Sequence, residues 1–141
     1  MLFAKLYLAV FLGFAALDAL WIGVLMKDFY SSEFGEIARR ENGSLAPRWP
    51  AAVAVYLLIP LGIVLFVRPA IGPAAALPRS MAWGAAYGLI GYGIYDLTNR
   101  ATLTRWSLRV TVIDMLWGTV ICALSSGLMV IVERWLTRPA T

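Results

Sequence analysis

The sequence predicts an all-α integral membrane protein, a four-helix bundle with a short interfacial amphipathic helix between spans one and two. Of its 141 residues, 61% are hydrophobic and 14% charged, whereas a soluble domain usually has about 45–50% apolar and about 25% charged residues. Four apolar runs, at about 2–26, 49–67, 81–97 and 108–132, are each long enough to cross ~30 Å of hydrocarbon as a helix. We therefore expect a single transmembrane domain over residues 1–141.

Charged residues are rare inside the four runs. The first run is interrupted only by Lys5 and Asp18, the second has no charge, and the third has only Asp96. The fourth run contains Arg109 and Asp114. An acidic residue at the bilayer centre costs about 2.5–3.5 kcal/mol, so such residues normally face the bundle interior, water or a partner.

The connection at 27–48 is the longest one and has a pattern of its own. Its apolar residues, among them Tyr30 and Phe34, fall on one helical face, while most of its charged residues fall elsewhere. This spacing predicts a short helix lying in the membrane interface, which Asn42-Gly43 could end. An irregular loop is the alternative for this connection.

Glycine and proline mark the second and third spans. Pro60 lies inside the second run and should kink that helix. The proline-rich segment 68–80 should form the turn to the third run. Gly84 and Gly88 form a small-residue ridge in the third run, which is suited to close helix packing.

Composition excludes several classes of function. The chain has no histidine and one cysteine, Cys122, so it can form neither a Cys/His zinc site nor an internal disulfide. The net charge is +4, but the basic residues lie mostly at the ends of apolar runs, where they anchor to lipid headgroups. We expect no metal, no cofactor and no nucleic acid. The expected partners are membrane lipids, with a homodimer or a larger membrane complex as further candidates.

Helix direction should bring three carboxylates into one layer. Asp18 lies in the last third of the first run, Asp96 at the end of the third, and Asp114 in the first third of the fourth. Because successive spans alternate in direction, all three acids should lie in the same half of the bilayer, whichever way the protein is oriented.

Polar and aromatic residues surround these acids. Trp21 follows Asp18 by three positions, and Trp117 follows Asp114 in the same way, so each indole shares a helical face with its acid. Arg105 and Arg109 are four residues apart and could together bind one anion. The candidate ligand-binding residues are therefore Asp18, Trp21, Tyr92, Asp96, Thr98, Asn99, Arg105, Arg109, Asp114 and Trp117.

Four explanations of this layer remain open from the residues alone. The acids could serve only as interhelical hydrogen-bond partners, or they could bind a small amphiphile or lipid-like molecule. They could also carry protons in a small transporter acting as a dimer. Alternatively, the chain could be an accessory subunit that packs through the ridge on its third span. Whether the protein is an enzyme is left open, because a carboxylate could act as a general acid or base.

Several motifs resemble those of one family. The stretch Tyr-Asp-Leu-Thr-Asn-Arg-Ala-Thr-Leu at 95–103 is followed by Trp106, Asp114 and Trp117-Gly118-Thr119. This pattern resembles the signature of a bacterial family of predicted membrane proteins called domain of unknown function 2177. Leu17-Asp18 with Trp21-Ile22-Gly23 is similar to its first-helix motif, and Val67-Arg68-Pro69-Ala70 to the end of its second. The resemblance implies a small four-span protein of the bacterial inner membrane and carries no catalytic role.

Overall fold

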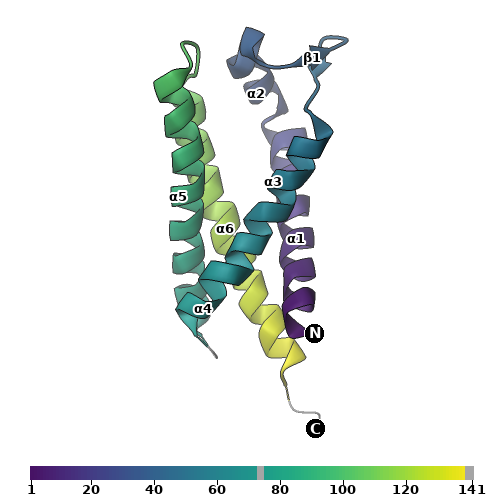
Figure 1. Cartoon of the computed structure of the whole chain (residues 1–141), viewed down its shortest axis with the longest axis vertical. Helices are drawn as coiled ribbons and strands as arrows, with labels where there is room; N and C mark the ends of the chain where they lie inside the picture. The colour runs from purple at the N-terminus through teal and green to yellow at the C-terminus, as the bar shows by residue number, and fades with distance from the viewer. Residues whose placement is uncertain (73–74, 139–141) are drawn as a thin grey trace.

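A computed structural model of the chain describes residues 1–72 and 75–138 and is almost entirely helical there (Figure 1). The first rod consists of α1 (Leu2–Leu20) and the π-helical segment η1 (Trp21–Leu25). The second joins α3 (Trp49–Gly62), the π-helical η3 (Ile63–Val67) and α4 (Arg68–Ile71). The last two are α5 (Leu77–Thr102) and α6 (Leu108–Leu136). The predicted all-α fold with four long helices is confirmed.

Three of these rods, Leu2–Leu25, Trp49–Ile71 and Leu108–Leu136, are long and apolar enough to cross a membrane. The fourth long helix, α5, spans 26 residues but is less apolar, because it contains Arg79, Arg100 and several glycines. At ~1.5 Å per residue, a helix of this length exceeds the ~30 Å hydrocarbon thickness. We describe α5 as the fourth membrane helix, enclosed on one side by α6.

The helix ends differ from the predicted ones near the prolines. The predicted turn at 68–80 is too long, since α4 continues to Ile71 and α5 already begins at Leu77. Pro78 stands in the first turn of α5, where the missing N–H has no partner to lose. Pro69 follows the π-helical η3 inside the continuous second rod. Residues 73 and 74 of the predicted turn lie outside the described residues. Pro60 lies inside α3, and the winding widens to the π form at Ile63.

The helix α6 holds the bundle together. It packs along α5 and against α1, while α3 lies beside α1 and the second rod contacts α5 mainly through η3 and α4 (Figure 1). The N-terminus and the end of α6 lie at one end of the bundle, and α2 with the small hairpin lies at the other. We call the latter the α2 end. Four long helices that alternate in direction produce this arrangement.

The small-residue ridge is used inside the chain. A Cβ atom on Gly88 would lie 2.0 Å from the carbonyl oxygen of Gly118, and one on Gly84 would lie 2.4 Å from the carbonyl oxygen of Cys122. The backbones of α5 and α6 therefore approach closely at both positions. Because α6 covers the ridge, the ridge is used for packing within the chain, and a larger membrane complex stays a prediction.

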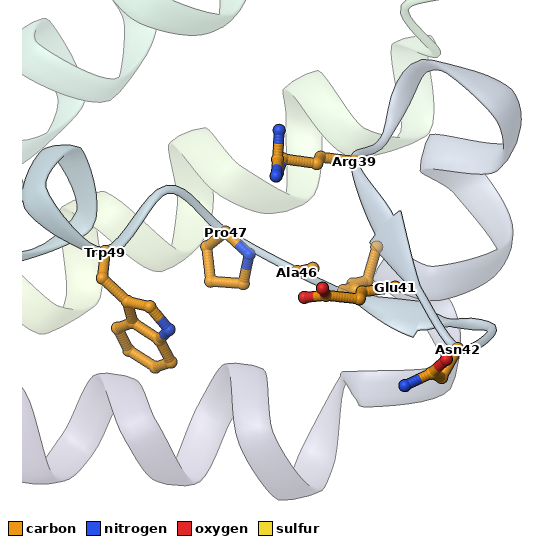
Figure 2. A pocket seen from close by; sticks show the side chains of 7 residues that line it. Arg39, Glu41, Asn42, Ala46, Pro47 and Trp49 are labelled. Carbon is orange, nitrogen blue, oxygen red and sulfur yellow. The ribbon is translucent and has the colours of Figure 1, made fainter.

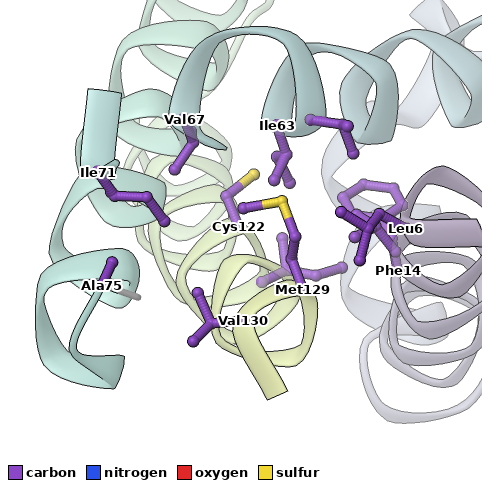
Figure 3. Close-up of a cluster of buried hydrophobic side chains, with 12 residues drawn as sticks. Leu6, Phe14, Ile63, Val67, Ile71, Ala75, Cys122, Met129 and Val130 are labelled. Atoms are coloured by element: carbon purple, nitrogen blue, oxygen red, sulfur yellow. The ribbon is translucent and has the colours of Figure 1, made fainter. Parts of the chain in front are cut away.

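The apolar core fills the bundle away from the α2 end. Leu6, Val10 and Phe14 of α1 belong to this core together with residues of η3 and of the second half of α6. Figure 3 shows Leu6 and Phe14 beside Ile63 and Met129. Beyond this core, the Arg68 guanidinium donates from Nε and Nη2 to the Glu133 carboxylate, with Nη2 to Oε1 at 2.6 Å. This bidentate pair ties the end of the second rod to the end of α6.

The connection between the first two rods is only partly helical. The predicted short helix is confirmed as α2 (Lys27–Phe34), which is followed by a 3-10 turn, η2 (Gly35–Ile37). A two-stranded hairpin follows, with β1 (Arg40–Glu41) paired to β2 (Ser44–Leu45). The prediction that Asn42-Gly43 ends the helix is wrong. Both residues have positive φ, +50° and +78°, and form the hairpin turn that an Asn-Gly pair favours.

Candidate functional site

Asp18 is a buried junction of three helices. Its side chain on α1 is 5% exposed. Its two carboxylate oxygens accept hydrogen bonds from different helices: the Tyr56 hydroxyl of α3 donates at 2.6 Å, and the Trp117 indole of α6 donates at 2.8 Å. Both oxygens thus have a partner within the protein, which offsets much of the cost of placing this acid in a membrane span.

Asp114 accepts a hydrogen bond from a residue of α2. The hydroxyl of Tyr30, which is buried in α2, donates to Oδ1 of Asp114, and the Trp21 indole donates to the same hydroxyl at 3.2 Å. Burial and the neighbouring Asp114 carboxylate raise the pKa of Tyr30 above its usual range, so this tyrosine stays a donor at neutral pH. Asp114 itself is half-buried.

The two predicted tryptophans join these clusters. The rings of Trp21 and Trp117 stack with their centroids 4.3 Å apart and their planes within 6°. Each indole also donates to a different group, Trp21 to Tyr30 and Trp117 to Asp18. The motif spacing therefore placed both rings correctly, and they form one wall shared by Asp18 and Asp114.

Asp96 differs from the other two acids. Its side chain on α5 is 0% exposed, and neither carboxyl oxygen has a hydrogen-bond partner. The buried indole N–H of Trp106, in the connection between α5 and α6, lies next to this carboxyl group, but the two do not meet the geometry of a hydrogen bond. Asp114 lies within electrostatic range of Asp96, and Asp18 within range of Asp114. The three acids thus form one connected layer with a single member whose hydrogen bonds are not made by the chain.

Arg105 and Arg109 contact glutamates and not the aspartates. Arg105 pairs with Glu36, and Arg109 donates to Glu33 at 3.2 Å. Both arginine side chains are largely exposed, while Glu33 is only 16% exposed. These ion pairs connect α2 and η2 to the α5–α6 connection and the start of α6. The two arginines that were predicted to bind one anion therefore bind carboxylates of the protein itself.

Aromatic rings also pack against one another at the α2 end, next to these ion pairs. The Phe34 ring lies 5.6 Å from that of Tyr30 and 5.5 Å from that of Trp106, centroid to centroid. Trp106 in turn meets the edge of Tyr95 at 5.7 Å. We call α2 with η2 the cap, because its aromatic residues and its two ion pairs cover the layer of acids.

The remaining predicted residues lie on α5. Tyr92 packs closely on α6, since a Cβ on Gly118 would lie 2.2 Å from its ring. Asn99 is half-buried, and Thr98 is exposed, with its carbonyl accepting a bond from Thr102. The structure therefore brings together Asp18, Trp21, Tyr92, Asp96, Asp114 and Trp117, while Thr98, Arg105 and Arg109 point to the outside.

Two tyrosines of the site were not predicted. Tyr30 was interpreted only as part of an apolar face, and Tyr56 lies in a run without any charge. A signal was present for Tyr56, because a hydroxyl inside an apolar span needs an acceptor, and buried acids on neighbouring spans are the strongest ones available. Glu33, Glu36 and Trp106 were also missed as parts of the site.

A hollow at the surface of the α2 end lies beside the hairpin and not among the acids. Figure 2 shows it between Arg39, Glu41 and Asn42 on one side and Pro47 and Trp49 on the other. Within the described residues, no group of three or more acidic or sulfur ligands is placed to hold a metal ion.

The comparison with family models identifies the chain. A model described as "Predicted membrane protein (DUF2177)" matches residues 3–131. The chain belongs to this family. The match covers all four long helices up to residue 131 of α6, including every residue of the acid layer and the cap. It confirms a multi-pass membrane protein, in agreement with the resemblance of the motifs. Searches of curated proteins and of solved structures gave no significant match.

Tyr30 allows the cap to be tested directly. Tyr30→Phe should keep the ring packing but remove the donor to Asp114 and the acceptor for Trp21. At about 1 kcal/mol for a lost hydrogen bond, local opening of α2 should become about fivefold more frequent. Trypsin cleavage after Lys27 should accelerate by that factor. Tyr95→Phe removes a hydroxyl from a position that is 56% exposed and should leave the rate unchanged; equal rates for both variants would contradict a docked cap.

Proposed function

We propose that this protein binds the headgroup of a small amphiphile or lipid-like molecule in the layer of acids beneath the cap. The observation that supports this is Asp96, a fully buried carboxyl group whose two oxygens have no hydrogen-bond partner among the described residues. A buried polar group without a partner costs about 1–3 kcal/mol, more if it is charged. Asp18, by comparison, has a partner for each oxygen.

The surroundings favour a molecule that has both a polar and an apolar part. Polar groups gather at the α2 end of the bundle, while exposed apolar side chains such as Ile94 and Leu97 continue along α5 toward the hydrocarbon. An amphiphile could place its headgroup beneath the cap and its chain along this surface. The membrane we propose is the bacterial inner membrane, where the molecule would enter from one leaflet.

Proton-coupled transport has less support. The acids lie at the α2 end, and the opposite half of the bundle is filled by the buried apolar cluster of α1, η3 and α6. Protons crossing one chain would have to pass this apolar core. A ligand site open to one leaflet does not require such a path, and it is also compatible with a homodimer.

Native mass spectrometry would test the proposal. The protein is purified in an uncharged maltoside detergent, washed at increasing detergent concentration, and measured for bound molecules. We expect one tightly held amphiphile on the wild-type chain and at least tenfold lower occupancy in Asp96→Asn. Ile131→Ala, a change at a residue of α6 that is 54% exposed and lies at the opposite end of the bundle, should retain it. No bound molecule on the wild type, or equal occupancy in Asp96→Asn, would contradict ligand binding at this layer.

A further inference from the structure

The charge around the layer of acids is not balanced by the chain. The ion pairs among the described residues are Arg68–Glu133, Arg105–Glu36 and Arg109–Glu33, and none of them includes Asp18, Asp96 or Asp114. Arg105 and Arg109 contact glutamates of the cap. Arg100, one turn after Asp96 on α5, donates to the backbone carbonyl of Trp106 at 3.2 Å. An anionic headgroup would therefore meet carboxylates that no described ion pair neutralises.

The hydrogen-bond donors available to the acids are also too few. Asp18 accepts two bonds and Asp114 accepts one from Tyr30, whereas Asp96 accepts none. A carboxylate can only accept hydrogen bonds. The adjacent Trp106 indole has a single N–H and could serve at most one of the two Asp96 oxygens. A ligand that completes this site should therefore be a donor, and an ammonium group supplies several donors and no acceptor together with a positive charge.

The walls of the layer favour the same chemistry. The indoles of Trp21 and Trp117 and the phenols of Tyr30 and Tyr92 surround the acids. Aromatic rings beside carboxylates attract organic cations through the negative faces of the rings. Bare metal ions are less suited to the layer, because the described carboxylates do not converge as a metal site would require.

We propose that the headgroup bound beneath the cap is an ammonium group, so that the ligand is a cationic or amine-bearing amphiphile. This inference rests on the proposed function and specifies the substrate class of the same site. The whole chain has a net charge of +4, so general electrostatic attraction would disfavour a cation. A preference for ammonium would thus come from the local layer of acids and not from the protein as a whole.

A set of probes with one chain length tests the inference. The full chain in maltoside is titrated with dodecylammonium, dodecanol and dodecanoate below their micellar concentrations, and bound molecules are counted by native mass spectrometry. We expect dodecylammonium to bind at least tenfold more tightly than dodecanol, and dodecanoate to bind least. Asp96→Asn should weaken dodecylammonium binding about tenfold, and Ile131→Ala, at the opposite end of the bundle, should leave it unchanged.

The outcomes separate the two proposals. If dodecanol or dodecanoate binds as tightly as dodecylammonium and Asp96→Asn weakens that binding, the site exists but its ligand is not cationic. If no probe responds to Asp96→Asn, both the ligand class and the proposed function are wrong. Butylammonium tests whether the ligand needs a long alkyl chain. Weak binding of this short probe supports a membrane amphiphile. Binding equal to that of dodecylammonium shows that the site takes a soluble amine and overturns the proposal of an amphiphilic ligand.

Discussion

Gly88→Ala should be among the most destabilising single changes in this protein. The added Cβ would lie 2.0 Å from the carbonyl oxygen of Gly118 and 2.8 Å from the Cβ of Cys122. Neither atom can move away without a shift of the α6 backbone, so α5 and α6 must separate. Overpacking in a core costs about 1–3 kcal/mol when side chains can adjust, and we expect at least about 3 kcal/mol here.

Gly91→Ala is the matched control on the same helix. A Cβ at Gly91 would have no atom within 4 Å, and alanine improves helix propensity by about 0.5–1 kcal/mol. The free energy of unfolding, measured in bicelles for both variants, should therefore fall sharply for Gly88→Ala and stay equal or rise for Gly91→Ala. Similar values for the two variants would show that α5 and α6 do not approach as closely as the structure indicates.

The same contact positions the acids. Asp96 and Asp114 lie on α5 and α6, in the half of each helix next to their connection. Gly88 and Gly118 set the distance between α5 and α6 next to these two acids. Gly88→Ala should therefore also reduce ligand occupancy, although Gly88 is outside the layer of acids.

The sequence predicted the long helices well because hydropathy and helix length are local properties. The three apolar rods lie close to the expected runs, and the ends of α5 were missed because Arg79 and Arg100 interrupt its apolar pattern. Helix direction then predicted the shared end of the bundle for Asp18 and Asp114, and the i+3 spacing predicted that Trp21 and Trp117 join them.

The partners of the acids were not predictable in the same way. Glu36 and Arg105 are 69 residues apart, and no periodic pattern links two such positions. The turn at Asn42-Gly43 was misinterpreted because the pair suits both a helix end and a hairpin. A helical pattern also shows which face of α2 is apolar, but it does not show that the Tyr30 hydroxyl donates to Asp114.

Asp18 should contribute mainly to stability, which a double-mutant cycle can measure. Asp18→Ala leaves the Tyr56 hydroxyl and the Trp117 indole without their acceptor. Interhelical hydrogen bonds in membranes average about 0.6 kcal/mol and reach about 1.7 kcal/mol. Because both donors lose their partner together, we expect a loss of about 1–3 kcal/mol for the single variant.

The cycle pairs Asp18→Ala with Tyr56→Phe and, separately, with Trp117→Phe. Each pair should show a coupling energy of about 1 kcal/mol in the free energy of unfolding, since each second change removes the donor of one bond. Tyr87→Phe is the control, because the Tyr87 hydroxyl donates to the Ile59 carbonyl and not to Asp18. Coupling near zero for both test pairs would show that these bonds do not join α1 to α3 and α6.

This cycle also separates the two roles that the acids can have. A carboxylate whose oxygens are both occupied by donors of the protein fixes the helices, whereas one without partners is free to meet a ligand. Asp18→Asn should therefore lower stability but change dodecylammonium binding much less than Asp96→Asn. If Asp18→Asn abolished binding while the unfolding free energy stayed unchanged, the roles of Asp18 and Asp96 would have to be exchanged.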